Sequence, residues 1–204
     1  MASDGMSSTT LNNNVHAQQR AERYTAVAVW LHWLIALFLF GQIAFGWFLE
    51  TIPRGTPLRG PYVNIHKSTG IILGLLILVR LIWRLAHRPP DYPSFVARWE
   101  RIASKLTQFL LYTCMLVMPL SGYIASNFSK YGVKFFNSVT LPPWGPEDKT
   151  LYAVFNTTHV MTSYLLVALI VLHLIGALRH AFHRDGVVAR MWLGSTEDSR
   201  RWDR

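Results

Sequence analysis

The chain has 204 residues, of which 51% are hydrophobic and 13% aromatic, and it carries a formal net charge of +9. Its mean hydropathy of +0.22 excludes a disordered chain and an ordinary soluble domain, so we expect one membrane domain. The single cysteine, Cys114, lies in an apolar stretch and excludes a disulfide framework.

The first 25 residues form a polar segment. They include three consecutive asparagines at 12–14 and charged residues at 20, 22 and 23, without a short apolar core followed by a small-residue cleavage site. We therefore predict no removable signal peptide, and we expect this segment to stay on the cytoplasmic side as a tail.

Four apolar segments follow, and each is long enough to cross a bilayer, which requires about 20 helical residues. They are residues 26–49, 66–86, 106–127 and 156–182. The sequence thus predicts an all-α membrane protein with a four-transmembrane-helix, up-and-down bundle. The corresponding division of the chain is a polar N-terminal tail (1–25), the transmembrane domain (26–186) and a cytoplasmic C-terminal tail (187–204).

Two connecting segments differ in character. Between the second and third apolar segments, Phe95, Trp99 and Ile102 recur at helical spacing opposite basic residues. This pattern indicates either a short helix on the inner membrane surface or a solvated linker. The 128–155 loop contains several glycines and prolines, so we expect it to be irregular.

Basic residues are concentrated in the tails and between the second and third apolar segments, whereas the two loops expected on the other side hold fewer. This asymmetry predicts that both termini lie in the cytoplasm. The positive charge is then explained by its position beside membrane lipid. No recognisable nucleic-acid-binding motif accompanies it, so we expect no nucleic-acid partner.

Four histidines lie within the apolar segments or at their ends: His32, His66, His159 and His173. In an up-and-down bundle, His32 and His173 share the cytoplasmic half, while His66 and His159 share the outer half. The 14 positions between His159 and His173 correspond to a rise of about 21 Å and a return to within about 40° of the same helix face. One helix can therefore contribute to two sites at different depths.

A neutral imidazole with one free ring nitrogen is a good iron ligand, so facing histidines indicate a haem held between helices. The chain lacks the C-x-x-C-H motif, so such a haem is bound non-covalently. Hydrogen bonding across helices and proton relay are the alternatives for any single histidine. The residue four positions after each histidine is small, which leaves room for a macrocycle but is also common at helix contacts. These residues are Ala36, Gly70, Ser163 and Ala177.

Short motifs are spread over most of the chain. They are Trp-Leu-His-Trp at 30–33, Ile-His-Lys-Ser-Thr-Gly at 65–70, arginines at 80 and 84, Leu-Tyr at 111–112, Met-Pro-Leu-Ser-Gly-Tyr at 118–123, Ala-Leu-Arg-His-Ala-Phe at 177–182, Arg-Asp-Gly at 184–186 and Arg-Met at 190–191. Together they resemble the prokaryotic cytochrome b561 family over about residues 24–193. The resemblance implies a cytochrome of the bacterial inner membrane with two non-covalent haem b groups. It pairs His32 with His173 and His66 with His159 as axial ligands.

The resemblance also implies a function. The family includes a type that oxidises superoxide on the periplasmic side and reduces ubiquinone, and its other members are electron-transfer cytochromes. Two departures bear on an inner-side quinone pocket: Gln108 stands where many relatives have histidine, and Trp-Leu-Gly at 192–194 replaces the usual Leu-Pro-Gly. We expect a superoxide:quinone oxidoreductase or, alternatively, a passive relay between the quinone pool and a periplasmic redox partner. A haem-free transporter or anchor is the third hypothesis.

The segments expected on the outer side, residues 51–65 and 128–146, contain no acidic residue, and basic residues lie in them or next to them. These basic residues are Arg54, Arg59, Lys67, Lys130 and Lys134. Their field would attract a small anion such as superoxide, and Lys67, beside His66, is our candidate for steering it; contacts with lipid headgroups or haem propionates are the alternative. On the inner side, Arg80 and Arg179 are candidates for pairing with propionates, or else reach the headgroups.

Overall fold

The computed structural model describes residues 24–93, 95–183 and 185–191, and most of these are helical. Helices α2 (Ala26–Thr51), α3 (Arg59–Ala86), α4 (Arg98–Asn127) and α5 (Lys149–His183) are followed by a short 3-10 helix, η1 (Val188–Met191). A two-stranded antiparallel hairpin, β1 (Val133–Phe135) and β2 (Val139–Leu141), lies between α4 and α5.

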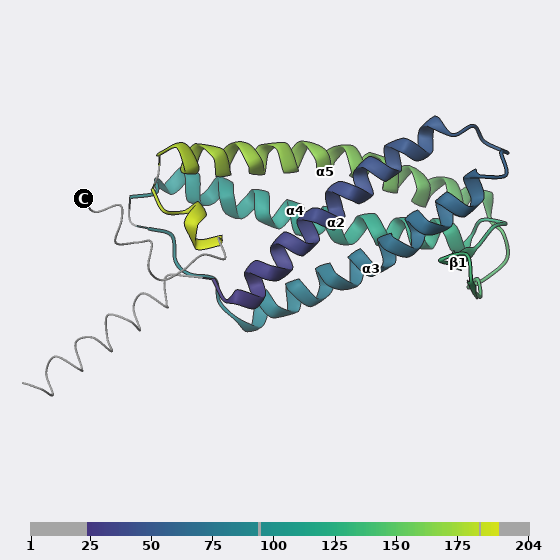
Figure 1. Cartoon of the computed structure of the whole chain (residues 1–204), viewed down its shortest axis with the longest axis horizontal. Coiled ribbons are helices and arrows are strands. Elements are labelled where there is room, and N and C mark those ends of the chain that lie inside the picture. The colour runs from purple at the N-terminus through teal and green to yellow at the C-terminus, as the bar shows by residue number, and fades with distance from the viewer. Residues whose placement is uncertain (1–23, 94, 184, 192–204) are drawn as a thin grey trace, which may run out of the picture.

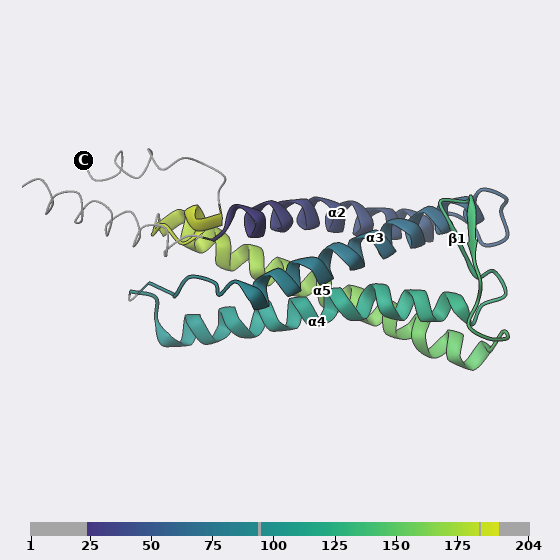
Figure 2. The ribbon, with the colours of Figure 1, turned by 90° about the horizontal axis from the view of Figure 1, so that it is seen from below.

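Each of the four long helices is long and apolar enough to cross a membrane. Successive helices run in opposite directions along an elongated bundle, as Figure 1 shows. The predicted four-helix membrane fold is therefore confirmed. We call the end where α2 begins and α5 finishes the terminal end, and the opposite end, which carries β1 and β2, the hairpin end (Figure 2).

Three helices begin about two turns before the apolar segments do. α3 begins at Arg59, α4 at Arg98 and α5 at Lys149. Capping explains two of these starts, because the Asp148 carboxylate accepts hydrogen bonds from the first backbone N–H groups of α5, and Glu100 accepts one from Ala97 N. Hydropathy marks the part of a helix inside the bilayer, whereas caps decide where the helix begins.

Both expectations for the connecting segments need correction. Trp99 and Ile102 belong to α4 itself, and Phe95 lies in the turn before it, so the separate surface helix was a wrong prediction. No helix breaker stands between Arg98 and the apolar part of α4, and the helix runs on without a break. The 128–155 loop is less irregular than expected, because it contains the hairpin and the first turns of α5.

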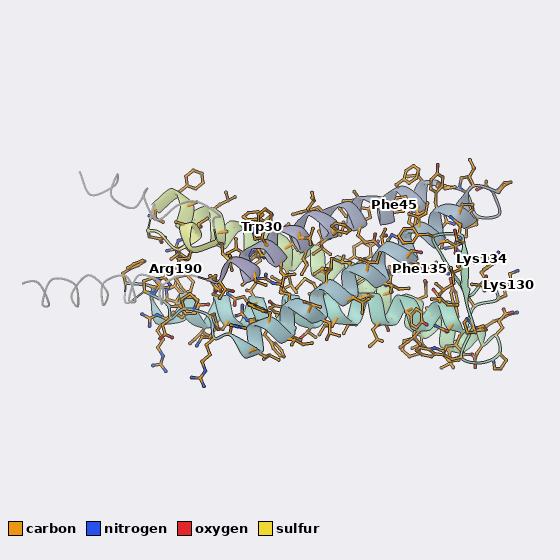
Figure 3. All side chains as sticks on the ribbon, turned by 60° about the horizontal axis from the view of Figure 1, so that its bottom comes forward. Trp30, Phe45, Lys130, Lys134, Phe135 and Arg190 are labelled. Atoms are coloured by element: carbon orange, nitrogen blue, oxygen red, sulfur yellow. The ribbon has the colours of Figure 1, made fainter. Side chains whose placement is uncertain are left out.

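The hairpin is anchored to α3 by polar contacts. Its turn places Phe136 and Asn137 at positive φ, 46° and 60°, a conformation that non-glycine residues adopt at a cost. The Ser68 hydroxyl accepts a hydrogen bond from Phe136 N (2.7 Å), and Asn64 Nδ2 donates to Asn137 Oδ1 (2.9 Å). These anchors hold the strained turn over the hairpin end of α3, where Figure 3 labels Lys130, Lys134 and Phe135.

The helices pack unevenly at the level of their backbones. α4 packs along α5 and against α3, and α2 packs against α3; neither α2 nor α3 lies comparably close to α5. Two small groups of buried side chains fill the middle of the bundle, and Leu39 and Met115 contact both. The groups are Ile35, Leu73 and Ile77, and Cys114, Leu166 and Leu169.

Replacing Ser68 with alanine tests the anchoring of the hairpin. The variant leaves the Phe136 N–H without its acceptor, which we expect to cost about 1–3 kcal/mol, read as a lower unfolding temperature of the purified protein in detergent. Ser126→Ala is the matched control, because the buried Ser126 hydroxyl donates only within its own helix, to Gly122 O. Equal losses in the two variants would contradict the anchoring role.

Candidate functional site

At the terminal end, the structure brings together His32 of α2 and His173 of α5. Their ring centroids are 6.2 Å apart and their planes are inclined by 75°. Both side chains are half-buried. We call them the terminal-end pair.

At the hairpin end, His66 of α3 and His159 of α5 form an equivalent pair. Their ring centroids are 6.4 Å apart, with planes inclined by 82°. Both rings line a partly open pocket whose other walls are mostly apolar, with Gln42 as a polar exception and Gly70 as a small one. We call them the hairpin-end pair.

The geometry of both pairs fits one iron atom held between two imidazoles. A metal–imidazole bond is about 2 Å long, so two rings that hold one ion from opposite sides have centroids about 6 Å apart. Each pair also joins α5 to a helix that does not pack closely against its backbone, and the hairpin-end pair borders an open pocket. Among the described residues, His, Cys, Asp and Glu form no group of three or more that could hold a metal ion. Each candidate iron site therefore offers two protein ligands, the two histidines of one pair.

The orientation of His159 is fixed by the backbone of α4. Its Nδ1 donates to the Met118 carbonyl oxygen at 2.8 Å, which leaves Nε2 as the nitrogen with a free lone pair. Nδ1 of His66, in contrast, is buried without a hydrogen-bond partner. In the hairpin-end pair, a hydrogen bond therefore orients His159, whereas packing alone holds His66. This packing includes the Phe45 ring, whose centroid lies 5.9 Å from that of the His66 ring.

A polar network lies beside the terminal-end pair. Arg80, only 9% exposed, donates from Nε to Tyr112 Oη (3.0 Å) and from Nη1 to the Ala28 carbonyl (2.5 Å). Arg84 donates to Gln108 Oε1 at 2.7 Å. A partly open pocket between α2, α3 and α4 is lined by residues that include Arg80, Arg84 and Tyr112. Gln108, one of the two departures noted in the sequence, is thus a partner of Arg84, whereas residues 192–194 lie outside the described residues.

Arg179 and Lys67 are each engaged with a neighbour. Arg179 forms an ion pair with Glu100 and stacks over the Trp99 ring, 5.7 Å from its centroid. Lys67 is half-buried and donates from Nζ to the Gly132 carbonyl at 2.8 Å, beneath the hairpin. To bind an anion such as superoxide or a haem propionate, each side chain would have to share its present partner or release it.

His180 is also accounted for, outside the two pairs. Its Nδ1 lies 2.5 Å from Asp185 Oδ2, just beyond the end of α5. Burial is the largest single influence on this carboxyl and opposes its ionisation, but the hydrogen bonds from His180 and Val187 N together with the nearby histidine charges outweigh burial and lower the pKa of Asp185. The contact holds the chain as it leaves the helix.

Three features of the site were not predicted from the sequence: Gln42, the Met118 carbonyl and Gly122. Gln42 donates to the His66 carbonyl at 2.6 Å and accepts from the Thr69 hydroxyl at 2.8 Å. The Met118 carbonyl and Gly122 both touch the His159 ring. Gly122 stands in one of the quoted motifs, but nothing in its spacing shows which side chain it faces. A lone glutamine in an apolar segment was a usable signal for Gln42.

The fold defines a class of protein: a multi-pass membrane protein with four helices that are long and apolar enough to span the bilayer and with two histidine pairs between them. Comparison with known proteins agrees. The sequence profile of the family "Prokaryotic cytochrome b561" matches residues 23–194. Two curated relatives come from Escherichia coli (strain K12). Cytochrome b561 homolog 2 is 26% identical over 178 residues, covering 87% of this chain and 95% of its own length. Cytochrome b561 homolog 1 is 29% identical over 179 residues, covering 83% and 96%.

The chain therefore belongs to the prokaryotic cytochrome b561 family. It is a membrane b-type cytochrome that binds b-type haem and transfers electrons. The resemblance seen in the sequence motifs is confirmed.

Proposed function

We propose that the chain binds two haem b groups, one at each histidine pair, and conducts electrons across the membrane between them. The observation that carries this proposal is the recurrence of one arrangement at two depths: imidazole rings 6.2 Å and 6.4 Å apart, each pair contributed by α5 and a helix spaced away from it. A haem bound at each pair would supply one-electron oxidation and reduction.

The residues themselves restrict the chemistry. A histidine on each side of the iron leaves no coordination position for oxygen, so the expected reaction is outer-sphere electron transfer. The apolar walls of the hairpin-end pocket exclude water from the ligand nitrogens. The mid-bundle side chains Ile77 and Leu166, 1% and 0% exposed, separate the two sites.

In the bacterial inner membrane, we place the terminal end in the cytoplasm and the hairpin end in the periplasm. The supporting observation is the concentration of arginines and lysines in both tails and in residues 80–105. The basic side chains beside the membrane then meet anionic lipid on the cytoplasmic face.

The proposed substrates are superoxide at the hairpin end and ubiquinone at the terminal end. Two superoxide anions each give up one electron and leave as oxygen. Ubiquinone takes up both electrons, together with two protons from the cytoplasmic side, and leaves as the quinol. Two one-electron sites in series match this requirement, because they can hold both electrons before the quinone is reduced.

Positive charge at the hairpin end supports the choice of superoxide. Lys67 adjoins His66 in the sequence, and Lys130 and Lys134 are exposed on the loop above it (Figure 3). Arg59 is paired with Glu50 and also donates to backbone carbonyls at the end of α2, so it adds less to the field. We assign the steering role to Lys67, the cation nearest in sequence to a proposed ligand.

At the terminal end, the pocket lined by Arg80, Arg84 and Tyr112 is the proposed quinone site. Hydroxyl and guanidinium groups there can donate hydrogen bonds to quinone oxygens. Arg80 is also the stronger candidate for a propionate contact, because its charge acts on both His32 and His173, whereas Arg179 would first have to leave Glu100.

Replacement of single histidines tests the proposed pairing. His66→Ala and His159→Ala should each lose the same haem, and His32→Ala and His173→Ala should each lose the other, since one ligand alone holds haem poorly. The measurement is haem per polypeptide, with the low-temperature spectrum of each remaining haem. A common spectrum for the His32 and His66 variants would contradict the pairing.

Stopped-flow mixing of the oxidised protein with superoxide tests the substrate. We expect haem reduction followed by reoxidation on addition of a ubiquinone analogue, with a rate that falls as salt is raised. Lys67→Gln should slow the reduction severalfold, and Lys105→Gln, which removes an exposed charge at the terminal end, should not. A haem that superoxide does not reduce would leave the relay to a periplasmic redox partner as the function.

A further inference from the structure

Gly122 of α4 touches the ring of a proposed ligand on another helix. A Cβ atom at this position would lie 2.8 Å from Nδ1 of His159 and 3.0 Å from its Cε1. These distances are shorter than atoms in proper contact allow. The ring of His159 therefore lies directly on the backbone of α4, and only glycine permits this approach.

The same approach brings the ring to a hydrogen-bond acceptor. Met118 precedes Gly122 by one helical turn, and its carbonyl oxygen accepts the Nδ1–H of His159 at 2.8 Å. A carbonyl can only accept, so the proton must be on Nδ1 and the lone pair on Nε2. Steric space at Gly122 and the acceptor at Met118 thus fix both the plane of the ring and its tautomer.

The partner ring has no such support. Nδ1 of His66 is buried and unpartnered. The nearest glycine, Gly46, would place a Cβ 3.4 Å from His66 Cε1, which is an ordinary contact. The two members of the hairpin-end pair are therefore inequivalent.

We propose that Gly122 is a positioning residue: it lets the His159 ring approach α4 and donate its hydrogen bond to the Met118 carbonyl. This bond would lower the reduction potential of a haem bound at the hairpin-end pair. A hydrogen bond from Nδ1–H makes Nε2 more basic, and a more basic ligand favours the oxidised metal. This inference rests on the proposed ligation by His159. It adds a tuning residue from a helix that supplies no ligand.

Gly122→Ala in the full-length holoprotein is the test. The added methyl should displace the ring and weaken the bond to Met118, because the nearest atoms that it would meet are those of the His159 ring itself. We expect a higher midpoint potential and an altered low-spin EPR signal at the hairpin-end haem, or about 10- to 100-fold weaker retention of that haem. The terminal-end haem should keep its spectrum and potential, and it reports that the variant has folded.

Two glycines provide matched controls. Gly176→Ala, in α5, has no atom within 4 Å of the new methyl, and Gly46→Ala meets His66 only at ordinary contact distance. Both should resemble the unmodified protein. A Gly122→Ala protein whose potential and EPR signal match those of the Gly176→Ala control would overturn the inference. Retention of both haems by His159→Ala would instead reject the ligation on which the inference rests.

If Gly122→Ala loses both haems, the unmodified protein still gives an answer. In the reduced, diamagnetic holoprotein labelled with ¹⁵N-histidine, one hairpin-end ligand should show the Nδ1 shift of a hydrogen-bonded N–H and the other that of a free one. Identical Nδ1 shifts for His66 and His159 would contradict the asymmetry.

Discussion

The structure depends on the spacing of α5 from α2 and α3. α5 carries one histidine of each pair, yet its backbone packs closely only on α4 among the long helices. Membrane helices lack a hydrophobic driving force for association, because lipid tails are as apolar as their side chains, so the residues at each contact decide how closely two helices approach. α4 packs against both α3 and α5 and therefore influences how far His66 lies from His159, although α4 itself contains no histidine.

Two close contacts of α4, each between a glycine and a ring, help to set its separation from α3 and α5. The ring of Pro119 lies against Gly74 of α3, where a Cβ would come within 3.1 Å of it, and one turn away the His159 ring lies against Gly122. Pro119 and Gly122 are three positions apart and so lie about 60° from each other around the axis of α4, and the two contacts bring α3 and α5 to neighbouring faces of the same stretch of α4. A bulky residue at either glycine would push one helix outward and change the gap across the hairpin-end pair.

The sequence was sufficient for the features that follow from periodicity and length. Apolar segments long enough to span a bilayer predicted four helices, and alternation of their direction grouped His32 with His173 and His66 with His159, which the structure places side by side. Features that depend on contacts between distant residues were not accessible. The ion pair of Arg179 with Glu100 joins residues 79 positions apart, and the fit of Gly122 to His159 depends on the rotation of two helices about their axes, which hydropathy does not determine.

The surroundings of the two pairs differ in a way that bears on the direction of electron flow. Arg80 places a buried positive charge that acts on both members of the terminal-end pair, and a positive charge stabilises the reduced state of a nearby redox centre. The Met118 carbonyl acts in the opposite sense on the hairpin-end pair, because it increases the basicity of His159. Under the proposed assignment of one haem to each pair, these two effects favour donation from the hairpin end and acceptance at the terminal end, and the positive charge of Lys67 near His66 acts against them. The favoured direction runs from the face with exposed lysines to the pocket lined by Arg80, Arg84 and Tyr112, as oxidation of an anion at one surface and reduction of a quinone near the other would require.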